Sequence, residues 1–263
     1  MPVVMMTVDL SGRVAFITGA AGGIGSALAA AFAANGAAVV VADINAQGAT
    51  EVASALPDAL GVALDVRDPA SIDRAVGEAM AQWGRIDILI NNAGVNTFAH
   101  RVHIDEFPIE EWHRIVSVDL DGLFLVSRAA LKPMLARGEG RVINIASVAG
   151  LVPLRLQSPF VAAKAGVVNL TKSMALELGP RGILTNCIAP GSTLTEGTRK
   201  LFYGEDGKFS TRVADMLRHV PLGRPAETSE IAAAALFLAD PENGYINGHV
   251  LAVDGGWTAG YMM

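Results

Sequence analysis

The sequence predicts an α/β fold: a doubly wound parallel sheet covered by helices on both faces. Short, wholly apolar runs such as RVAFIT (residues 13–18) and VVVADIN (39–45) alternate with longer stretches of helical spacing. Runs that are apolar throughout, rather than at every second position, indicate strands buried on both faces. The chain has 263 residues and no visible linker, repeat or low-complexity segment. We therefore expect a single domain spanning residues 1–263.

Composition narrows the class of protein. Hydrophobic residues make up 51% of the chain, charged residues 17%, and the formal charge is −6. An acidic chain is a poor match for nucleic acid or an anionic membrane surface, so neither is expected as a partner. The start, MPVVMMTVDLSGR, is too short and lacks the early basic residue of a signal peptide, and no uncharged apolar stretch reaches the ~20 residues of a membrane span. The expectation is a soluble, cytoplasmic protein.

The first element that carries chemistry is the glycine turn after the first strand. In TGAAGGIGSALAAAFAANGA, Gly19, Gly22, Gly23 and Gly25 form a turn without side chains, and an Ala-rich helix begins there. Unpaired N–H groups and the positive end of the helix would face a phosphate. An ordinary tight turn between strand and helix is the alternative. The strand before the turn and the helix after it favour the phosphate site.

The second strand ends in Asp43, about 20 residues after the glycines. A carboxylate at this point can accept both hydroxyls of a ribose and would repel a 2′-phosphate. No Arg or Lys stands beside Asp43 in the sequence to reverse that preference, so NAD is the expected cofactor. The alternative is that Asp43 only caps the helix that starts near Asn45.

The next elements continue the alternation. ALGVALDV is a third strand ending at Asp65, residues 70–84 are helical, and IDILINNAG is a fourth strand breaking at Asn91, Asn92 and Gly94. Residues 95–108 form a polar loop whose His100, Arg101 and His103 are either solvated residues or substrate contacts. No metal-ligating set is predicted.

Six further elements and one wide irregular segment complete the chain. One helix is expected from about residue 109 to 136, interrupted by nothing stronger than Gly122, and another over 157–179. RVINIAS and ILTNCIAPG are strands, and the one cysteine, Cys187, is expected to be an inert core thiol. Residues 191–222 have little apolar period and are predicted to form a substrate lid. A last helix should begin at a Thr or Ser cap in ETSEIAAAALFLAD, with Glu230 close behind, and NGHVLAVDGGW is the seventh strand.

The segment SVAGLVPLRLQSPFVAAK gives the clearest functional spacing. Ser147 ends an apolar strand, Phe160 follows thirteen residues later, and Lys164 comes four residues after that. With 3.6 residues per turn, positions 160 and 164 lie on one face of a helix.

Together these stretches resemble the short-chain dehydrogenase/reductase family over nearly the whole chain, from Gly12 to Gly256. The matching motifs are TGAAGGIG, the aspartate of VVVADIN, LDV, NNAG, IASVAG, the frame S-x12-F-x3-K, IAPGSTLT and VDGG. The resemblance implies one Rossmann-type domain with a seven-stranded parallel sheet, a nicotinamide cofactor at the carboxyl ends of its strands, and a homotetramer or homodimer. The high hydrophobic content and the two long helices agree with such an assembly.

The resemblance also implies roles for individual residues along the cofactor. The pyrophosphate is expected to contact Gly19, Gly23, Ile24 and Gly25, and the adenosine ribose is expected to bind Asp43. Asp65 and Val66 flank the adenine, Asn92, Ala93 and Gly94 line the cofactor, Lys164 bonds the nicotinamide ribose, and Thr193 and Thr195 lie near the nicotinamide amide.

The family's chemistry uses four side chains. A Tyr hydroxyl exchanges a proton with the substrate oxygen, a Lys lowers the pKa of that Tyr, a Ser holds the oxygen, and an Asn supports a water. This chain keeps Ser147 and Lys164, but has Asp119 at the Asn position and Phe160 at the Tyr position. Phe has no proton to give.

Three accounts of Phe160 remain open. It is an engineered substitution that holds substrate and cofactor without turnover, a natural loss of catalysis in a binding protein, or a sign that another acid, Asp119 or a lid residue, takes over. The first is favoured because Ser147 and Lys164 have not drifted.

The substrate is the least determined feature. Arg155 and Gln157 precede the Phe160 helix, and Arg199, Lys200, Tyr203, Lys208 and Arg212 crowd the predicted lid. These residues either form a solvated surface or favour a polar or anionic substrate. The predicted function is NAD-dependent interconversion of a secondary alcohol (a sugar, polyol or hydroxy acid) and its carbonyl, slowed by Phe160. The alternatives are a 3-oxoacyl thioester substrate, or a catalytically silent NAD-binding sensor or structural subunit.

Overall fold

A computed structural model describes residues 7–97, 100–195, 198, 209, 213, 215 and 217–260. Its centre is a seven-stranded, fully parallel sheet in the order β3-β2-β1-β4-β5-β6-β9, which confirms the predicted α/β class. The strands span β1 (Val14–Thr18), β2 (Ala38–Asp43), β3 (Ala59–Ala63), β4 (Ile88–Asn91), β5 (Gly140–Ile145), β6 (Ile183–Pro190) and β9 (Val250–Val253).

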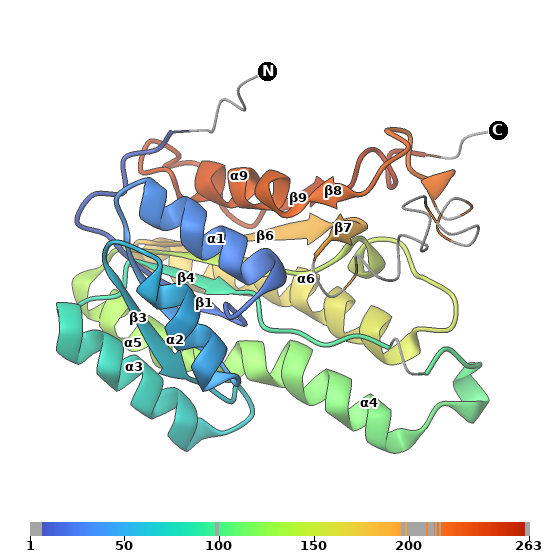
Figure 1. The fold of residues 1–263 in the computed structure, drawn as a ribbon, viewed down its shortest axis with the longest axis horizontal. Coiled ribbons are helices and arrows are strands. Elements are labelled where there is room, and N and C mark those ends of the chain that lie inside the picture. Colours follow the sequence, from blue (N-terminus) through green and yellow to red (C-terminus); the bar gives the residue numbers. More distant parts are fainter. Residues whose placement is uncertain are drawn as a thin grey trace.

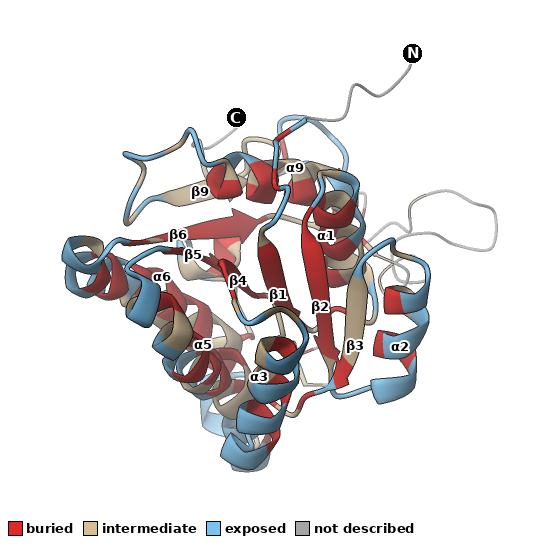
Figure 2. Cartoon of the chain, turned by 90° about the vertical axis from the view of Figure 1, so that its left-hand side faces the viewer, coloured by how far each residue is buried: buried red, intermediate tan, exposed pale blue. Residues whose placement is uncertain are grey.

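Helices cover both faces of this sheet (Figures 1 and 2). One layer consists of α1 (Gly23–Ala34), α2 (Ala46–Ser54) and α9 (Thr228–Ala239), and the opposite layer of α3 (Pro69–Trp83), α5 (Leu123–Arg137) and α6 (Ser158–Leu178). The helix α4 (Ile109–Val116) precedes α5 and extends beyond the sheet beside α6 (Figure 1).

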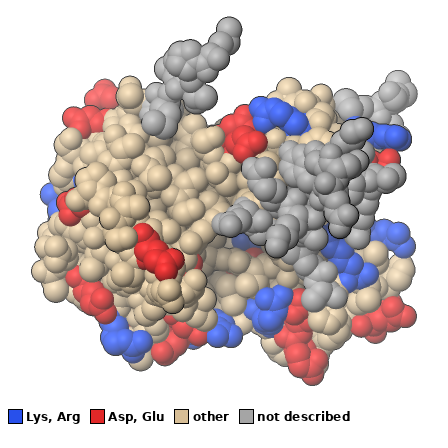
Figure 3. Space-filling model, viewed as in Figure 1, with Lys and Arg blue, Asp and Glu red and all other residues tan. Residues whose placement is uncertain are grey.

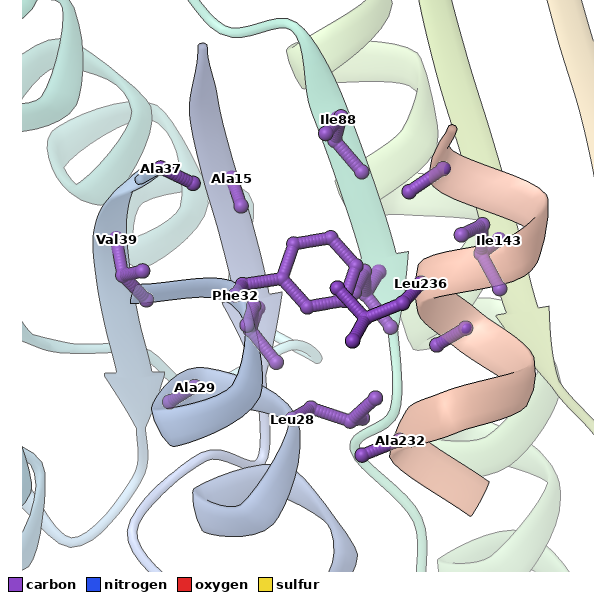
Figure 4. Packing of buried hydrophobic residues seen from close by; sticks show 14 of the residues in the cluster. Ala15, Leu28, Ala29, Phe32, Ala37, Val39, Ile88, Ile143, Ala232 and Leu236 are labelled. Carbon is purple, nitrogen blue, oxygen red and sulfur yellow. The ribbon is translucent and has the colours of Figure 1, made fainter. Parts of the chain in front are cut away.

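The strands are apolar throughout because each contributes side chains to both layers. In β1, Ala15 and Ile17 face α1 and α9, whereas Val14 and Phe16 face α3, α5 and α6. Figure 4 shows the first of these cores, where Phe32 of α1 lies against the sheet and close to Leu236 of α9. Burial of such side chains is worth roughly 1.5–3 kcal/mol each, so the two cores hold both layers on the sheet.

The chain reverses its direction of winding between β1 and β4. From β1 it proceeds to β2 and β3 on one side, and then crosses to β4, β5 and β6 on the other. Helices that follow neighbouring strands β1 and β4 therefore lie on opposite faces, and a crevice forms at the carboxyl ends of these strands.

The predicted helix over 109–136 is not one uniform helix. It consists of α4, a π-helical turn at Ser117–Gly122, and α5, which ends at Arg137. The expectation that nothing stronger than Gly122 interrupts it was therefore wrong. A π turn inserts one extra residue into the helical ladder, which rotates the side chains of this segment relative to those of α4.

The start of the last helix also differs from the prediction. The residue that caps α9 is Glu227 rather than a Thr or Ser, and its side chain and that of Glu230 form a reciprocal capping box. Thr228 is already the first helical residue. A carboxylate can accept the first free N–H groups just as a hydroxyl can, so the pattern predicted the helix but not its capping residue.

The predicted lid, residues 191–222, begins with a short strand. Thr193–Leu194 form the short strand β7, which pairs with β8 (Ala226–Glu227). Five residues predicted to crowd the lid lie outside the described residues: Arg199, Lys200, Tyr203, Lys208 and Arg212.

Two smaller expectations concern Cys187 and the membrane. Cys187 is fully buried in β6, and burial raises the pKa of its thiol to about 11, as expected of an unreactive core residue. None of the helices within the described part of the chain is both apolar and long enough to cross a membrane.

Candidate active site

A pocket of about 690 Å³ lies over the carboxyl ends of the central strands. One end of the pocket is at Asp43, the last residue of β2, and at Asp65, just after β3. The pocket passes the glycine turn after β1 and Asn92 after β4, and its other end is at Lys164 of α6. Its position is the crevice that the reversal of winding predicts.

The glycine turn brings an uncapped helix end to this pocket. The residue before α1 is Gly22, and no side chain caps the helix and no acidic residue stands in its first turn. Gly25 is essential to the shape, because a Cβ there would lie 2.1 Å from the carbonyl oxygen of Gly19. Uncapped N–H groups at a helix N-terminus are a binding site for phosphate, so these residues fit the pyrophosphate of a dinucleotide.

The turn is fixed to the neighbouring strand by side-chain hydrogen bonds. The Asn92 amide donates to the carbonyl oxygens of Thr18 and Gly19, both at 2.9 Å. In return, the Thr18 hydroxyl accepts from the N–H groups of Asn92 and Ala93 at 3.0 and 2.9 Å. The ends of β1 and β4 are thereby locked together, which keeps the crevice in one geometry.

The carboxylate of Asp43 points at the same turn. Its Oδ2 accepts from the N–H of Ala21 at 3.0 Å, and its Oδ1 accepts from the N–H of Asn45 at 2.9 Å. The helix α2 has a cap of its own, since the Asn45 side chain accepts from the N–H of Gly48. Asp43 lines the pocket and is therefore available to a ligand there, and helix capping does not account for it.

A basic residue, Arg67, also lines this end of the pocket. It lies 24 positions after Asp43 in the chain, so the absence of a basic neighbour in the sequence did not reveal it. Both carboxylate oxygens of Asp65 bind its guanidinium, at 2.9 and 2.7 Å, and these hydrogen bonds hold the pKa of Asp65 below its ordinary value. Arg67 is thus already neutralised.

The other end of the pocket contains Ser147, Phe160 and Lys164. Ser147 follows β5, and its hydroxyl accepts from the N–H of Ala149 at 3.2 Å. Phe160 and Lys164 lie one turn apart on α6, with the Lys164 ammonium 5.7 Å from the centroid of the Phe160 ring. The predicted common face of these residues is therefore present.

Lys164 is held by two acceptors inside the protein. Its ammonium donates to the carbonyl oxygen of Ile145 at 3.2 Å and lies 3.1 Å from Oδ2 of Asp119. Asp119 is in the π-helical turn, its side chain is fully buried, and its Oδ1 accepts from the N–H of Val95 at 2.7 Å. Asp119 occupies the position that the family resemblance assigns to a residue supporting a water. Here its side chain instead forms a buried ion pair with Lys164.

Most residues predicted for the site are brought together. The pocket is lined by the predicted residues Gly19, Ile24, Asp43, Asp65, Val66, Asn92, Ala93, Gly94, Asp119, Ser147, Phe160, Lys164, Thr193 and Thr195. Thr195 also lies close to Gly23, since a Cβ on that glycine would be 3.4 Å from its methyl group.

Four predicted residues do not line the described pocket. Gly23 and Gly25 lie in the first turn of α1 and do not line the pocket. Gln157 is buried beside Thr97, 3.4 Å from its hydroxyl, and Arg155 is exposed, 3.4 Å from His103. The substrate roles predicted for Arg155 and Gln157 stay predictions, and Arg199 lies outside the described residues.

A buried polar network beneath the pocket was not predicted from the sequence. Asn91 donates to Ser127 at 2.8 Å and to Asn144 at 2.9 Å, and Asn144 donates to Thr171 at 2.9 Å. Asparagines inside otherwise apolar strands, as in ILIN and GRVINI, were the available signal. The buried amide nitrogens of both asparagines find acceptors in this network, as buried polar groups usually do.

A second missed residue is Arg114 of α4, which lines the pocket near Asp119. Its guanidinium forms two hydrogen bonds with Glu111, at 2.6 and 2.7 Å, and another with the carbonyl oxygen of Asn96. Nothing in the helical pattern of residues 109–116 distinguished this arginine from a solvated one.

Charges on the surface do not form a basic patch on the face that Figure 3 shows. Among the described residues of that face, Lys and Arg alternate with Asp and Glu along the margins, and the surface over α1 is mostly uncharged. Within the described ranges, no three His, Cys, Asp or Glu side chains gather as metal ligands would.

Comparisons with known proteins agree with this geometry. Residues 19–258 match the family model described as "Enoyl-(Acyl carrier protein) reductase". The chain is 41% identical to D-threitol dehydrogenase of Mycolicibacterium smegmatis, over 95% of this chain and 94% of that one. It is 39% identical to the 3-oxoacyl-[acyl-carrier-protein] reductase FabG of Vibrio cholerae, over 94% of this chain and 98% of that one.

Among solved structures, the chain resembles that of levodione reductase. The TM-score is 0.88 at 34% identity, covering 95% of this chain and 99% of that one. A match of this extent shows that the two chains share the same fold.

Proposed function

Because the chain belongs to the short-chain dehydrogenase/reductase family of oxidoreductases, we propose that it binds NAD and interconverts a secondary alcohol and its carbonyl compound, slowed by Phe160. The observation that supports this best is the composition of one pocket. An uncapped helix end and Asp43 occupy one part of it, and Ser147 and Lys164 occupy another. Such a pocket matches a dinucleotide at one end and a reacting oxygen at the other.

The residues present have separate tasks in this proposal. The first turn of α1 receives the pyrophosphate, and Asp43 accepts hydrogen bonds from the adenosine ribose. Lys164 donates to the nicotinamide ribose, and the Ser147 hydroxyl holds the oxygen of the alcohol or carbonyl. When bound, the nicotinamide supplies or accepts the hydride.

The position of Phe160 determines the expected rate. The family resemblance assigns this position to the side chain that exchanges a proton with the substrate oxygen, and a phenyl ring has no such proton. Loss of a positioned acid or base lowers the rate by roughly 10²–10⁴. The ring still fills its place beside Lys164, so binding of cofactor and substrate is expected to persist.

The proposed substrate class is a polyol, sugar or hydroxy acid. A relative named for threitol, at 41% identity, supports a polyol. A 3-oxoacyl thioester is the alternative, because FabG of Vibrio cholerae is nearly as similar. The formal charge of −6 argues against that alternative, since a carrier protein with an acidic surface would be repelled.

A different class of function is a silent NAD-binding subunit or sensor, which Phe160 itself favours. We further propose a cytoplasmic location and a homotetramer or homodimer. Neither affects the choice between enzyme and binding protein.

The deciding experiment restores the hydroxyl. The chain and its Phe160→Tyr variant are assayed for NAD reduction against a panel of polyols, sugars and hydroxy acids, and for oxidation of reduced cofactor with a 3-oxoacyl thioester. A matched control carries both Phe160→Tyr and Ser147→Ala. Activity that appears with Tyr and is lost with Ala supports a dehydrogenase and identifies its substrate class. Silence across both panels, with NAD still bound, favours the binding protein.

A further inference from the structure

We propose that Asp119 prevents the pocket from disfavouring the oxidised, cationic form of the nicotinamide cofactor relative to the reduced form. This inference rests on the proposed function, since it presumes that the pocket binds this cofactor. It assigns Asp119 a role in selecting the redox state of the ligand, rather than a proton-transfer role.

The surroundings of Asp119 are those of a carboxylate. Its side chain is fully buried, and its Oδ1 accepts from the N–H of Val95 at 2.7 Å. Its Oδ2 accepts no hydrogen bond from the described residues and lies 3.1 Å from the ammonium of Lys164, to which it is bound as an ion pair. An uncharged amide at this position could accept at one end only, because its nitrogen is a donor.

The Asp119–Lys164 pair faces the pocket across a glycine. A Cβ on Gly94 would lie 3.3 Å from Oδ2 of Asp119 and equally 3.3 Å from the Lys164 ammonium. Any larger residue at position 94 would therefore press against the pair. Both members line the pocket, so their charges act on a ligand through very little intervening protein.

Among the described residues, the charged side chains at this end of the pocket form neutral pairs. Lys164 is balanced by Asp119, and Arg114 is balanced by Glu111, which binds it through two hydrogen bonds. Without the Asp119 charge, the same end would carry one net positive charge. A positive pocket repels a cationic nicotinamide ring, whereas the reduced ring is uncharged and is unaffected.

The consequence concerns the direction of the reaction. A pocket end without net positive charge does not weaken the binding of the cationic nicotinamide ring. The affinity for the oxidised cofactor is then set by its other contacts. Alcohol oxidation requires that form to bind first. The pair therefore removes one electrostatic obstacle to the oxidation of an alcohol.

The test is a ratio of binding constants, which does not depend on turnover. The dissociation constants of NAD⁺ and NADH are measured by calorimetry for the chain, for Asp119→Asn, and for Asp119→Ser as a second neutral variant of smaller size. The matched control is Asp121→Asn, which removes the same charge from the same π-helical turn at an exposed position. Circular dichroism confirms that each variant is folded.

Both neutral variants at position 119 should weaken NAD⁺ relative to NADH by roughly tenfold, and Asp121→Asn should leave the ratio within twofold. A ratio that does not move in a folded Asp119 variant overturns the inference and leaves the proposed function standing. An equal change in Asp121→Asn also overturns it, since the effect would then be one of overall charge. If the unsubstituted chain binds neither form, the proposed function itself fails.

Discussion

The Oδ2 atom of Asp43 accepts a 3.0 Å hydrogen bond from the backbone N–H of Ala21, so the end of β2 is tied to the glycine turn after β1. This bond fixes where the carboxylate can meet a ligand. It connects the two features, a helix N-terminus and an acidic residue, that would hold the two ends of an adenosine diphosphate.

The first prediction is a preference for NAD over NADP. A 2′-phosphate would be placed against the Asp43 carboxylate, and Arg67 cannot compensate because Asp65 already binds it. Repulsion in a partly shielded site corresponds to a difference on the order of a hundredfold in affinity. Titration of both cofactors measures it. Asp43→Asn should narrow the difference, whereas Asp73→Asn, an exposed change on α3, should not. Equal affinities in the unsubstituted chain would show that Asp43 does not select the cofactor.

The second prediction concerns Asp87, a buried carboxylate at the amino-terminal side of the sheet. It is bound by Arg85 at 2.6 Å, Arg137 at 2.7 Å and the N–H of Val14 at 2.9 Å. Burial alone would raise the pKa of Asp87, but these partners together hold it below its ordinary value. Asp87→Asn should lower the free energy of unfolding at neutral pH by roughly 3 kcal/mol, because it leaves buried donors without a charged partner.

The pH dependence of this effect follows from the lowered pKa. A carboxyl group whose pKa is lower in the folded state stabilises the protein fully above its unfolded value of about 3.9, and this contribution is lost as the pH falls toward the folded value. The difference between the chain and Asp87→Asn should therefore shrink below about pH 4. Urea unfolding at neutral and acidic pH provides the measurement. The control is Glu139→Gln, which changes a largely exposed partner of Arg13 and should alter stability by less than about 1 kcal/mol. A gap between chain and variant that stays constant with pH would refute the ion-pair explanation.

The sequence was sufficient for the sheet and for the outline of the pocket. Wholly apolar strands separated by helices leave few arrangements of a parallel sheet, and polar residues just after its strands must then meet at one edge. Asp43, Asn92 and Ser147 were found in this way, each at the end of an apolar run.

Side-chain contacts that depend on the folded geometry could not be predicted from the sequence. The side chain of Asp119 falls at helical spacing in SVDLDG, and that spacing does not distinguish a regular helix from a π turn. Its ion pair with Lys164 joins residues 45 positions apart, and the Arg67–Asp65 pair depends on rotamers. The orientations of Arg155 and Gln157 were inaccessible for the same reason, because position in a loop does not determine which way a side chain points.

The third prediction is self-association through the α4–α6 region. Phe124 of α5 is 51% exposed and Leu176 of α6 is 80% exposed, on helices already expected to pair between subunits. Exposed apolar side chains on long helices are typical of an interface. Light scattering at micromolar concentration should give the mass of a tetramer or dimer, and Phe124→Glu should lower it. The control Tyr245→Glu changes a fully exposed residue outside these helices. A monomer mass for the unsubstituted chain would rule out the predicted assembly.

The last prediction separates binding from turnover at Phe160. Lys164 is held by Ile145 and Asp119 rather than by residue 160, so its position should survive a change between Phe and Tyr. A hydroxyl restored at position 160 should raise turnover by roughly 10²–10⁴, equivalent to about 3–5 kcal/mol in the barrier. Dissociation constants for NAD should change far less, since one hydrogen bond contributes about 1 kcal/mol net.

Turnover and NAD binding are therefore measured side by side in the chain and in Phe160→Tyr. Phe160→Leu serves as a control, because it alters the ring without adding a proton and should not raise turnover. If the chain with Phe already turns over as fast as the Tyr variant, proton transfer does not pass through position 160, and Asp119 becomes the acid to test. If NAD binds only when Tyr is present, the hydroxyl at position 160 is needed for binding. An assignment of cofactor contacts that leaves out the side chain at position 160 would then be wrong.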